Sequence, residues 1–382
     1  MSPGASKRTP SGAGGGSRRT PGGGETRIPV AILGATGAVG QTFIRLLAGH
    51  PWFRVAEVAA SERSAGKSYA EATRWLEGTL PADVAALTVL TCDPARVSSP
   101  IVFSALDSAA AGDVEPAFAK AGRFVLSNAK NFRLEADVPL VIPEVNASHL
   151  GLIATQRKTR RWKGAIVTNA NCAATVATVA MAPLHERFGI RTVFAATMQA
   201  VSGAGYPGVP SLDILGNVIP YIGDEEPKIE REMQKMLGKL VGAEIEPAPF
   251  MVSAHANRVP VENGHTVCLS LGFDRAPTVE QALEALRGWR GSSAVRGLPS
   301  APDVPLLYRD EVDRPQPRRD VNEGRGMTVS VGRVRKDPIV HIKLVAMGHN
   351  TVRGAAGGAV LNAELLVHTG AIPGVGKPDR RG

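Results

Sequence analysis

The sequence predicts an α/β protein of two domains, in which a twisted parallel sheet is followed by an α+β domain with a mixed sheet. The chain has 382 residues, of which 43% are apolar, and this is enough to fill two compact cores. Residues 28–127 alternate short apolar strands with segments of helical spacing, which is typical of a parallel sheet. From about residue 166 the strands become longer, which favours a mixed or antiparallel sheet with helices on one face.

The expected elements can be placed along the chain from their apolar spacing. In the first part we expect strands at 28–33, 53–59, 101–104 and 123–127 and helices at 39–47 and 114–121. In the second part we expect strands at 191–199, 265–273 and 327–334 and helices beginning near 172, 225 and 278. Residues 350–369 read as one helix, because Asn350 and Thr351 can cap it. Residues 303–322 are rich in Pro, Arg and Asp and are expected to form a surface loop or lid.

The two ends of the chain carry most of its charge. The formal net charge is +9, of which residues 1–27 contribute +4 and the last six residues +2. The body has no basic stripe interleaved with aromatics, so we expect no nucleic-acid partner. Residues 1–26 and 371–382 are expected to be tails, the first of them disordered. The uncharged run 164–184 contains several Thr and Asn residues, so it predicts a buried strand, turn and helix rather than a membrane span.

Cysteine usage indicates a reducing compartment. Cys92, Cys172 and Cys268 are an odd count, with no close pairing and no metal-ligand spacing. We therefore expect free thiols, no metal site and a cytoplasmic protein. The basic N-terminus is not followed by an apolar stretch of the kind found in secretory signals.

A glycine-rich turn joins the first strand to the first helix. A dinucleotide pyrophosphate would bind there on free backbone N–H groups, although glycines also serve tight turns without a ligand. The flanking strand and helix favour the first interpretation and predict a Rossmann-type dinucleotide-binding domain. The residues expected to contact the cofactor in this turn are Gly34, Thr36, Gly37, Ala38 and Val39.

The end of the second expected strand bears on the choice of cofactor. Ser61, Arg63 and Ser64 could bind a 2′-phosphate, which favours NADP over NAD. If Glu57 or Glu62 points at the ribose, this preference weakens. A solvated charged turn without a ligand is the alternative.

Cys172 stands where an apolar strand runs into a helix of small residues. There the free N–H groups and the helix dipole can stabilise a thiolate and a developing oxyanion. A lone cysteine is more often an inert core residue, and Cys92 and Cys268 keep that interpretation. Arg258 and His265 lie seven residues apart across a glycine turn, and they offer a carboxylate clamp and a base that titrates near neutrality. Cys172 is therefore the candidate nucleophile.

Nine segments, taken in order, resemble those of aspartate-semialdehyde dehydrogenases, especially of the archaeal and fungal type. The resemblance runs from Ile28 to about Thr369. It is carried by residues 34–40, 127–133, 138–146, 171–173, 199–205, 217–222, 257–261, 264–266 and 350–364.

The resemblance implies a role for each matching residue. Cys172 would be the nucleophile, His265 the acid/base and Gln199 the residue that orients the substrate. Arg258 would bind the substrate carboxylate, Glu225 its ammonium, and Arg133, assisted by Lys228, its phosphate. Asn171 would also contact the substrate. Ser202, Gly203 and Asn350 would lie on the nicotinamide side. The implied domains are an NADP-binding domain at 27–165 with 347–370 and a catalytic and oligomerisation domain at 166–346, in a homodimer or homotetramer.

The implied reaction is the NADPH-dependent reductive dephosphorylation of β-aspartyl phosphate to aspartate semialdehyde, in the biosynthesis of lysine, methionine and threonine. A thioester on Cys172 would be the intermediate, and the pKa of His265 is expected near neutrality. A malonyl-coenzyme A reductase on the same frame is one alternative, although a malonyl group has no ammonium to pair with Glu225. A catalytically silent NADP-binding protein is another. His255 is a second imidazole near Arg258, and Glu225, Lys228 and Arg133 could be a surface ion-pair set.

Overall fold

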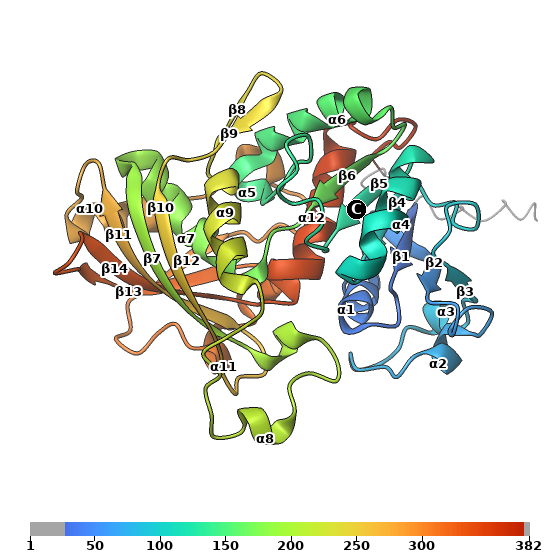
Figure 1. Ribbon diagram of the computed structural model, residues 1–382, viewed down its shortest axis with the longest axis horizontal. Helices are drawn as coiled ribbons and strands as arrows, with labels where there is room; N and C mark the ends of the chain where they lie inside the picture. Colours follow the sequence, from blue (N-terminus) through green and yellow to red (C-terminus); the bar gives the residue numbers. More distant parts are fainter. Residues whose placement is uncertain (1–26, 378–382) are drawn as a thin grey trace, which may run out of the picture.

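The first domain is a six-stranded parallel sheet with helices on both faces (Figure 1). A computed structural model describes residues 27–377, so the predicted tail at 1–26 lies outside the described residues. The sheet order is β3-β2-β1-β4-β5-β6. Its strands are β1 Ile28–Leu33, β2 Phe53–Ala60, β3 Val89–Thr91, β4 Ile101–Ser104, β5 Phe124–Ser127 and β6 Ala165–Thr168. The helices between them are α1 Ala38–Leu47, α2 Tyr69–Ala72, α3 Ala82–Ala85, α4 Ser108–Lys120, α5 Pro143–Asn146 and α6 Leu152–Arg160.

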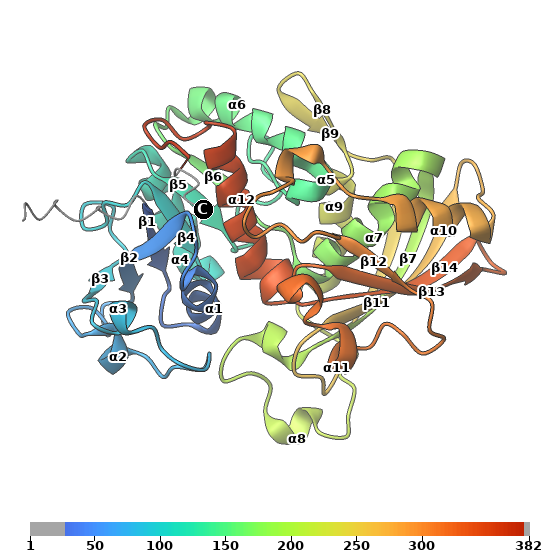
Figure 2. The same ribbon diagram turned by 180° about the vertical axis from the view of Figure 1, so that it is seen from behind.

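Alternate residues of the central strand face two separate cores. Val30 and Ile32 of β1 pack into the core under α1, whereas Ala31 and Leu33 pack into the core that contains Phe118 of α4. The C-terminal helix α12 (Gly357–His368) returns to the first domain and packs on the same side as α1, as the view from behind shows (Figure 2). The same core also holds Ile372, although residues 371–382 were expected to be a tail.

The second domain is built on a six-stranded mixed sheet. The strand order is β10-β7-β11-β14-β13-β12, and β7 is parallel to β10 but antiparallel to β11. These strands are β7 Ile190–Gln199, β10 Met251–Arg258, β11 His265–Phe273, β12 Leu306–Arg309, β13 Val329–Lys336 and β14 Ile342–Gly348. A small hairpin, β8 Lys239–Val241 and β9 Glu244–Glu246, stands apart from the sheet. The helices are α7 Cys172–Phe188, α8 Ser211–Ile214, α9 Glu225–Met236, α10 Val279–Gly288 and α11 Pro317–Asp320.

One face of the second sheet is covered and the other is open. Helices α7, α9 and α10 lie on the covered face, where Val193 and Ala195 of β7 join the same core as α7. On the other face Phe194 and Met251 are 44% and 72% exposed. The predicted two-domain α/β architecture is confirmed.

Strands β3, β10 and β14 were not expected, and three of the expected segments differ from the structure. Residues 350–369 are not one regular helix, because Val352–Ala356 forms a π-helical turn before α12 begins at Gly357. The expected loop at 303–322 contains strand β12, which extends the sheet beside β13. Helix α4 begins at Ser108, six residues earlier than expected, because Asp107 caps it through Ala110 N.

The uncharged run at 164–184 forms strand β6, a turn and the first part of α7, as predicted. Among the residues that the structure describes, no helix is both long enough and apolar enough to cross a membrane.

Candidate active site

Cys172 is the first residue of helix α7. Strand β6 ends at Thr168, and Asn171 caps the helix because its side-chain oxygen accepts a hydrogen bond from Ala174 N at 3.0 Å. The next residues are alanines and other small or apolar side chains, which lets the helix run through the core of the second domain. Cys172 therefore meets the free N–H groups of a helix N-terminus, as the sequence predicted.

His265, the first residue of β11, faces the sulfur. Its Nε2 lies 3.0 Å from Cys172 Sγ, although 93 residues separate the two in the chain. Its Nδ1 accepts a hydrogen bond from Ala200 N at 3.1 Å. A ring nitrogen that accepts carries no proton, so in the neutral imidazole the proton lies on Nε2, facing the sulfur.

Both groups are uncharged at neutral pH in this arrangement. Burial lowers the pKa of His265 to about 3, and the Arg258 guanidinium adds to this effect. Burial likewise raises the pKa of the Cys172 thiol to about 12, with a further contribution from the Glu225 carboxylate. The expectation that the pKa of His265 lies near neutrality is therefore wrong, because the ring is fully enclosed and sits beside a cation.

Arg258 lies beside this pair at the end of β10. Its Nη1 donates to Ala200 O at 2.8 Å, so Ala200 touches both Arg258 and His265 through its two main-chain groups. A Cβ on Gly203 would lie 2.9 Å from Arg258 Nη1 and 3.1 Å from His265 Cε1. The turn at 200–203 is thus packed directly over both side chains, and a larger residue at position 203 would have to displace them.

Glu225 joins two more of the predicted site residues. Its Oε1 accepts hydrogen bonds from Asn171 Nδ2 at 2.7 Å and from Gln199 Nε2 at 3.0 Å, and Lys228 Nζ lies 3.5 Å from Oε2. Glu225, Gln199 and Asn171 are all buried. The alternative of a surface ion-pair set is therefore wrong for Glu225.

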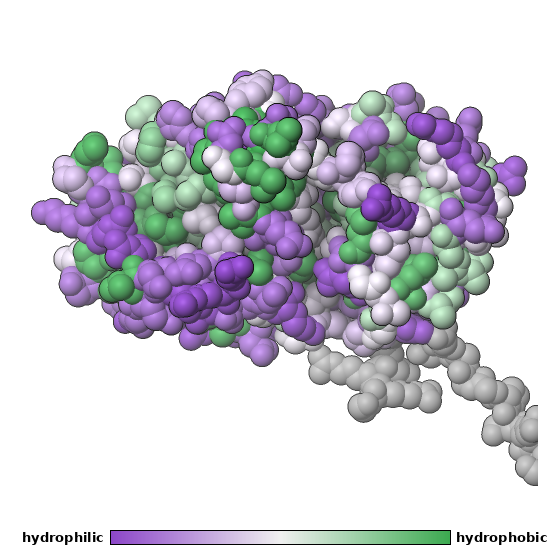
Figure 3. All heavy atoms as spheres, turned by 90° about the horizontal axis from the view of Figure 1, so that it is seen from below, coloured by the Kyte–Doolittle hydropathy of each residue, from purple (hydrophilic) through white to green (hydrophobic). Residues whose placement is uncertain are grey.

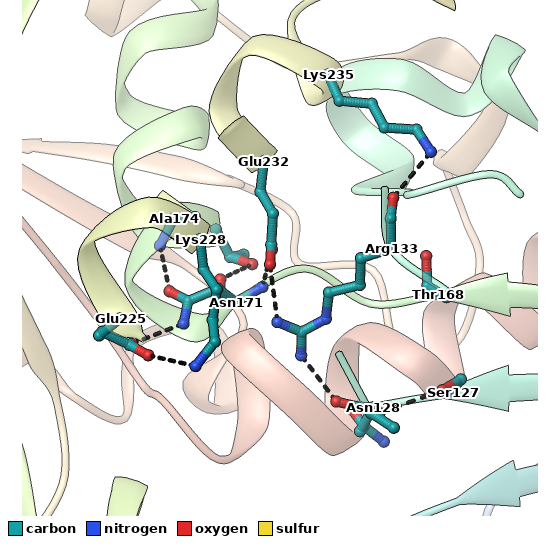
Figure 4. A network of polar contacts seen from close by, with 12 residues as sticks. Ser127, Asn128, Arg133, Thr168, Asn171, Ala174, Glu225, Lys228, Glu232 and Lys235 are labelled. Atoms are coloured by element: carbon teal, nitrogen blue, oxygen red, sulfur yellow. Dashed lines mark hydrogen bonds and ion pairs between the residues drawn. The ribbon is translucent and has the colours of Figure 1, made fainter. Parts of the chain in front are cut away.

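Arg133 approaches the site from the first domain and is also buried (Figure 4). Its Nη1 donates to Glu232 Oε1 at 3.0 Å and its Nη2 to Asn128 O at 2.7 Å. Lys228 contacts Glu225 and Gly223 O instead of Arg133. Glu232 was missed by the sequence analysis, and its helical spacing from Glu225 and Lys228 was the available signal.

The second imidazole lies elsewhere. His255 is exposed on β10, and its ring packs 5.5 Å from that of Phe194 on the open face of the sheet. His265 is therefore the imidazole at the sulfur.

The glycine turn predicted to bind a dinucleotide lies between β1 and α1, and a cleft opens beside α1. Gly34 has a φ of +69°, and a Cβ there would lie 2.5 Å from Ala105 O. Gly37 caps α1 without any side-chain hydrogen bond, so the N–H groups of the first turn remain available to an anion. A cleft of about 480 Å³ opens between α1 and the segment 201–215 and is lined by Ala38 and Ser202 among others. These features fit a dinucleotide whose pyrophosphate lies on the start of α1.

The loop after β2 fits a phosphate better than a bare ribose. Ser61 and Arg63 are exposed, with Ser64 half-buried beside them. Glu57 does not compete for the ribose, because its carboxylate accepts hydrogen bonds from the main-chain and hydroxyl groups of Ser98 and Ser99. The remaining competitor, Glu62, is exposed in the same turn.

Asn350 joins two turns beside the cleft. Its Nδ2 donates to Ser202 Oγ at 2.8 Å, and its Oδ1 accepts from Gly264 N at 2.9 Å. The residue thereby links the turn at 202 to the glycine that precedes His265. Asn350 and Ser202 thus lie between the cleft and the imidazole.

The fold and the site together define a class: a dinucleotide-dependent enzyme with a thiol and an imidazole in contact at its candidate active site. Comparison with known proteins agrees. The semialdehyde dehydrogenase NAD-binding domain matches residues 29–153, and the semialdehyde dehydrogenase dimerisation domain matches residues 181–353.

Comparison with individual proteins identifies the family more closely than the two matched domains do. Aspartate-semialdehyde dehydrogenase of Archaeoglobus fulgidus is 51% identical over 342 residues, which cover 89% of this chain and 98% of that protein. That of Schizosaccharomyces pombe is 47% identical over 352 residues, covering 90% and 99%. The solved structure of aspartate semialdehyde dehydrogenase with NADP from Candida albicans superposes with a TM-score of 0.84 at 42% identity, covering 90% of this chain and 100% of that one. The chain belongs to the aspartate-semialdehyde dehydrogenase family, so the resemblance seen in its motifs is confirmed.

Proposed function

We propose that this chain catalyses the NADPH-dependent reductive dephosphorylation of β-aspartyl phosphate to aspartate semialdehyde. The observation that carries the proposal is the contact between Cys172 Sγ and His265 Nε2 at the start of α7. Around it lie a buried guanidinium, Arg258, and a buried carboxylate, Glu225, which suit the carboxylate and the ammonium of an amino acid. The relatives named for this activity support the same substrate.

Cys172 forms the covalent bond in this mechanism. Its sulfur attacks the acyl carbon of the substrate, a C–S bond forms, the C–O bond to phosphate breaks, and the departing phosphate takes the thiol proton. The phosphate leaves toward Arg133, and the free N–H groups of α7 hold the oxyanion that develops. When bound, the reduced nicotinamide would supply hydride to the acyl carbon of the thioester. The C–S bond then breaks, the electron pair returns to sulfur, the aldehyde is released, and the sulfur regains a proton from solvent.

His265 acts as a neutral donor in this proposal. Because Ala200 N–H holds Nδ1, the imidazole presents its Nε2 proton to the sulfur and to the substrate oxygen beside it. The sulfur that becomes negative when the C–S bond breaks is thus stabilised by a neutral ring, and the positive charges of Arg133 and Arg258 lower the pKa of the thiol against the effect of burial.

The cofactor is held by this chain's own backbone and loop residues. The first turn of α1 would bind the pyrophosphate, and Ser61, Arg63 and Ser64 would bind the 2′-phosphate. Ser202, Gly203 and Asn350 would border the nicotinamide.

The test is the reverse reaction. Purified protein is supplied with phosphate, NADP and aspartate semialdehyde, and NADPH is followed by its absorbance. We expect turnover that requires phosphate and that falls by about three orders of magnitude in Cys172→Ser, with NADPH binding retained. Turnover only with malonate semialdehyde and coenzyme A would favour the malonyl reductase, and no turnover with either substrate would favour a silent NADP-binding protein.

We also propose that the chain forms a homodimer or homotetramer. The matched dimerisation domain spans the second sheet and the α8 segment. Residues 206–221 around α8 carry exposed apolar side chains, and Figure 3 shows the molecule from below, where hydrophobic and hydrophilic patches alternate. The exposed apolar side chains of this segment are Tyr206, Leu212, Leu215, Val218 and Tyr221. Light scattering on the purified chain tests the assembly, and a monomeric mass at assay concentration would contradict it.

The three cysteines are free thiols, which supports the cytoplasm as the compartment.

A further inference from the structure

Helix α9 presents a line of alternating charges to the active site. Glu225, Lys228, Glu232 and Lys235 are spaced three, four and three residues apart and so lie on one face of the helix (Figure 4). Glu225 and Lys228 contact other residues that are predicted to bind or orient the substrate. The other two, Glu232 and Lys235, are 1% and 8% exposed and have no assigned role.

Glu232 and Lys235 hold Arg133 at both of its ends. The guanidinium donates to Glu232 Oε1 at 3.0 Å, and Lys235 Nζ donates to the main-chain oxygen of Arg133 at 2.8 Å. The same ammonium donates to Glu135 O and Val138 O, also at 2.8 Å each. The loop that carries Arg133 belongs to the first domain, whereas α9 belongs to the second.

The second oxygen of Glu232 reaches the helix of the nucleophile. Asn171 N donates to Glu232 Oε2 at 2.5 Å, and Asn171 is the cap residue directly before Cys172. A single buried carboxylate therefore joins Arg133 to the start of α7. Because a buried carboxylate is costly unless it is paired, both of its partners are held firmly.

Two simpler roles for Glu232 fit less well. A surface residue would have its carboxylate in water, whereas Glu232 is buried. A purely structural ion pair would not need to contact two predicted site residues, Arg133 and Asn171. We propose that Glu232 and Lys235 are positioning residues. They fix Arg133 relative to Cys172, so that Arg133 binds the leaving phosphate while the sulfur attacks the acyl carbon. Lys235 acts on the Arg133 loop alone. Glu232 acts on Arg133 and on the cap of the nucleophile's helix.

This inference rests on the proposed role of Arg133 as the phosphate ligand, so the experiment includes Arg133→Lys. The KM for inorganic phosphate, the KM for aspartate semialdehyde and kcat are measured for Lys235→Met, Glu232→Gln and Arg133→Lys, each as the full-length oligomer. The rate of Cys172 alkylation by iodoacetamide is measured in parallel. Glu226→Gln is the matched control, because its Oε1 accepts a hydrogen bond from Ala256 N at 3.0 Å on another face of α9.

Lys235→Met should raise the KM for phosphate about fivefold or more, with kcat and the KM for the semialdehyde within about twofold. Glu232→Gln should raise the KM for phosphate and also change the alkylation rate at least about threefold, because an NH2 group replaces one of the two oxygens and then faces an N–H donor that it cannot accept from. Glu226→Gln should change none of these quantities.

Two results would overturn the inference. A lower KM for phosphate in Glu232→Gln would mean that Glu232 is only a counter-ion that competes with phosphate. Unchanged KM values for phosphate in Lys235→Met and Glu232→Gln, with both proteins folded by circular dichroism, would mean that Glu232 and Lys235 are structural residues. If Arg133→Lys itself leaves the KM for phosphate unchanged, the proposed phosphate site is wrong.

Discussion

Replacing Gly354 by alanine should disable the candidate nucleophile without replacing any side chain of the site. Gly354 lies in the π-helical turn at Val352–Ala356, where Gly354 N donates to His349 O at 3.0 Å. A Cβ at this position would lie 2.5 Å from Cys172 Cβ and 2.8 Å from Cys172 Cα. An ordinary contact begins near 3.4 Å, so the start of α7 must shift by about 0.9 Å.

That shift would stretch the 3.0 Å contact between Cys172 Sγ and His265 Nε2 to as much as about 3.9 Å. A displacement of this size can cost about 100-fold in rate, and overpacking costs about 1–3 kcal/mol of unfolding free energy. We expect kcat to fall about 100-fold while the Kd for NADPH, measured by fluorescence titration, stays within about twofold.

The control is Gly288→Ala, because Gly288 ends α10 with open space around its Cα. This variant should keep full activity. A kcat for Gly354→Ala within about threefold of the parent would refute the reasoning, because it would mean that the turn adapts without moving the sulfur.

Three further predictions follow from the site and its surroundings. Arg258→Lys keeps the charge but loses the planar fork, so the KM for the semialdehyde should rise much more than the KM for NADP in steady-state assays, and an equal rise would mean that Arg258 is misassigned. Arg63→Ala should raise the KM for NADP about tenfold or more and leave the KM for NAD unchanged; parallel changes would place the 2′-phosphate elsewhere. Burial raises the pKa of Glu115 from 4.5 to about 7, so between these values the native state keeps a proton that the unfolded chain has released. The unfolding free energy should therefore fall by about 3 kcal/mol as the pH rises through this window, and Glu115→Gln should remove that slope in denaturant titrations at pH 5 and pH 8.

The local elements were largely predictable because they depend on residues that are neighbours in the chain. Strands 101–104 and 265–273 lie where their apolar runs indicated, and the first helix begins within one residue of the expected position. Two of the exceptions involve tertiary contacts, whereas the early start of α4 comes from the local cap at Asp107. Residues 306–309 form a strand because β13 offers them a parallel edge, and in the π-helical turn Gly354 lies so close to Cys172 that an added Cβ would overlap it.

The chemistry of the site was also predicted in part. The position of Cys172 at a helix start followed from the strand and the small residues around it, and Arg258 and His265 followed from one short segment. Their protonation did not follow, because the pKa of His265 depends on enclosure by segments far away in sequence. Glu232 was missed, because its partner Arg133 lies 99 residues away.

The sequence by itself indicated many of the strands and helices, the glycine turn, the cofactor class and Cys172 as the candidate nucleophile, because periodicity, backbone freedom and residue chemistry are local properties. Only the tertiary structure decided which side chains meet. It placed an imidazole with its proton directed at the sulfur, and it joined Arg133 to the nucleophile's helix through one buried carboxylate. Such contacts depend on how two domains pack, and no pattern within a single segment carries that information.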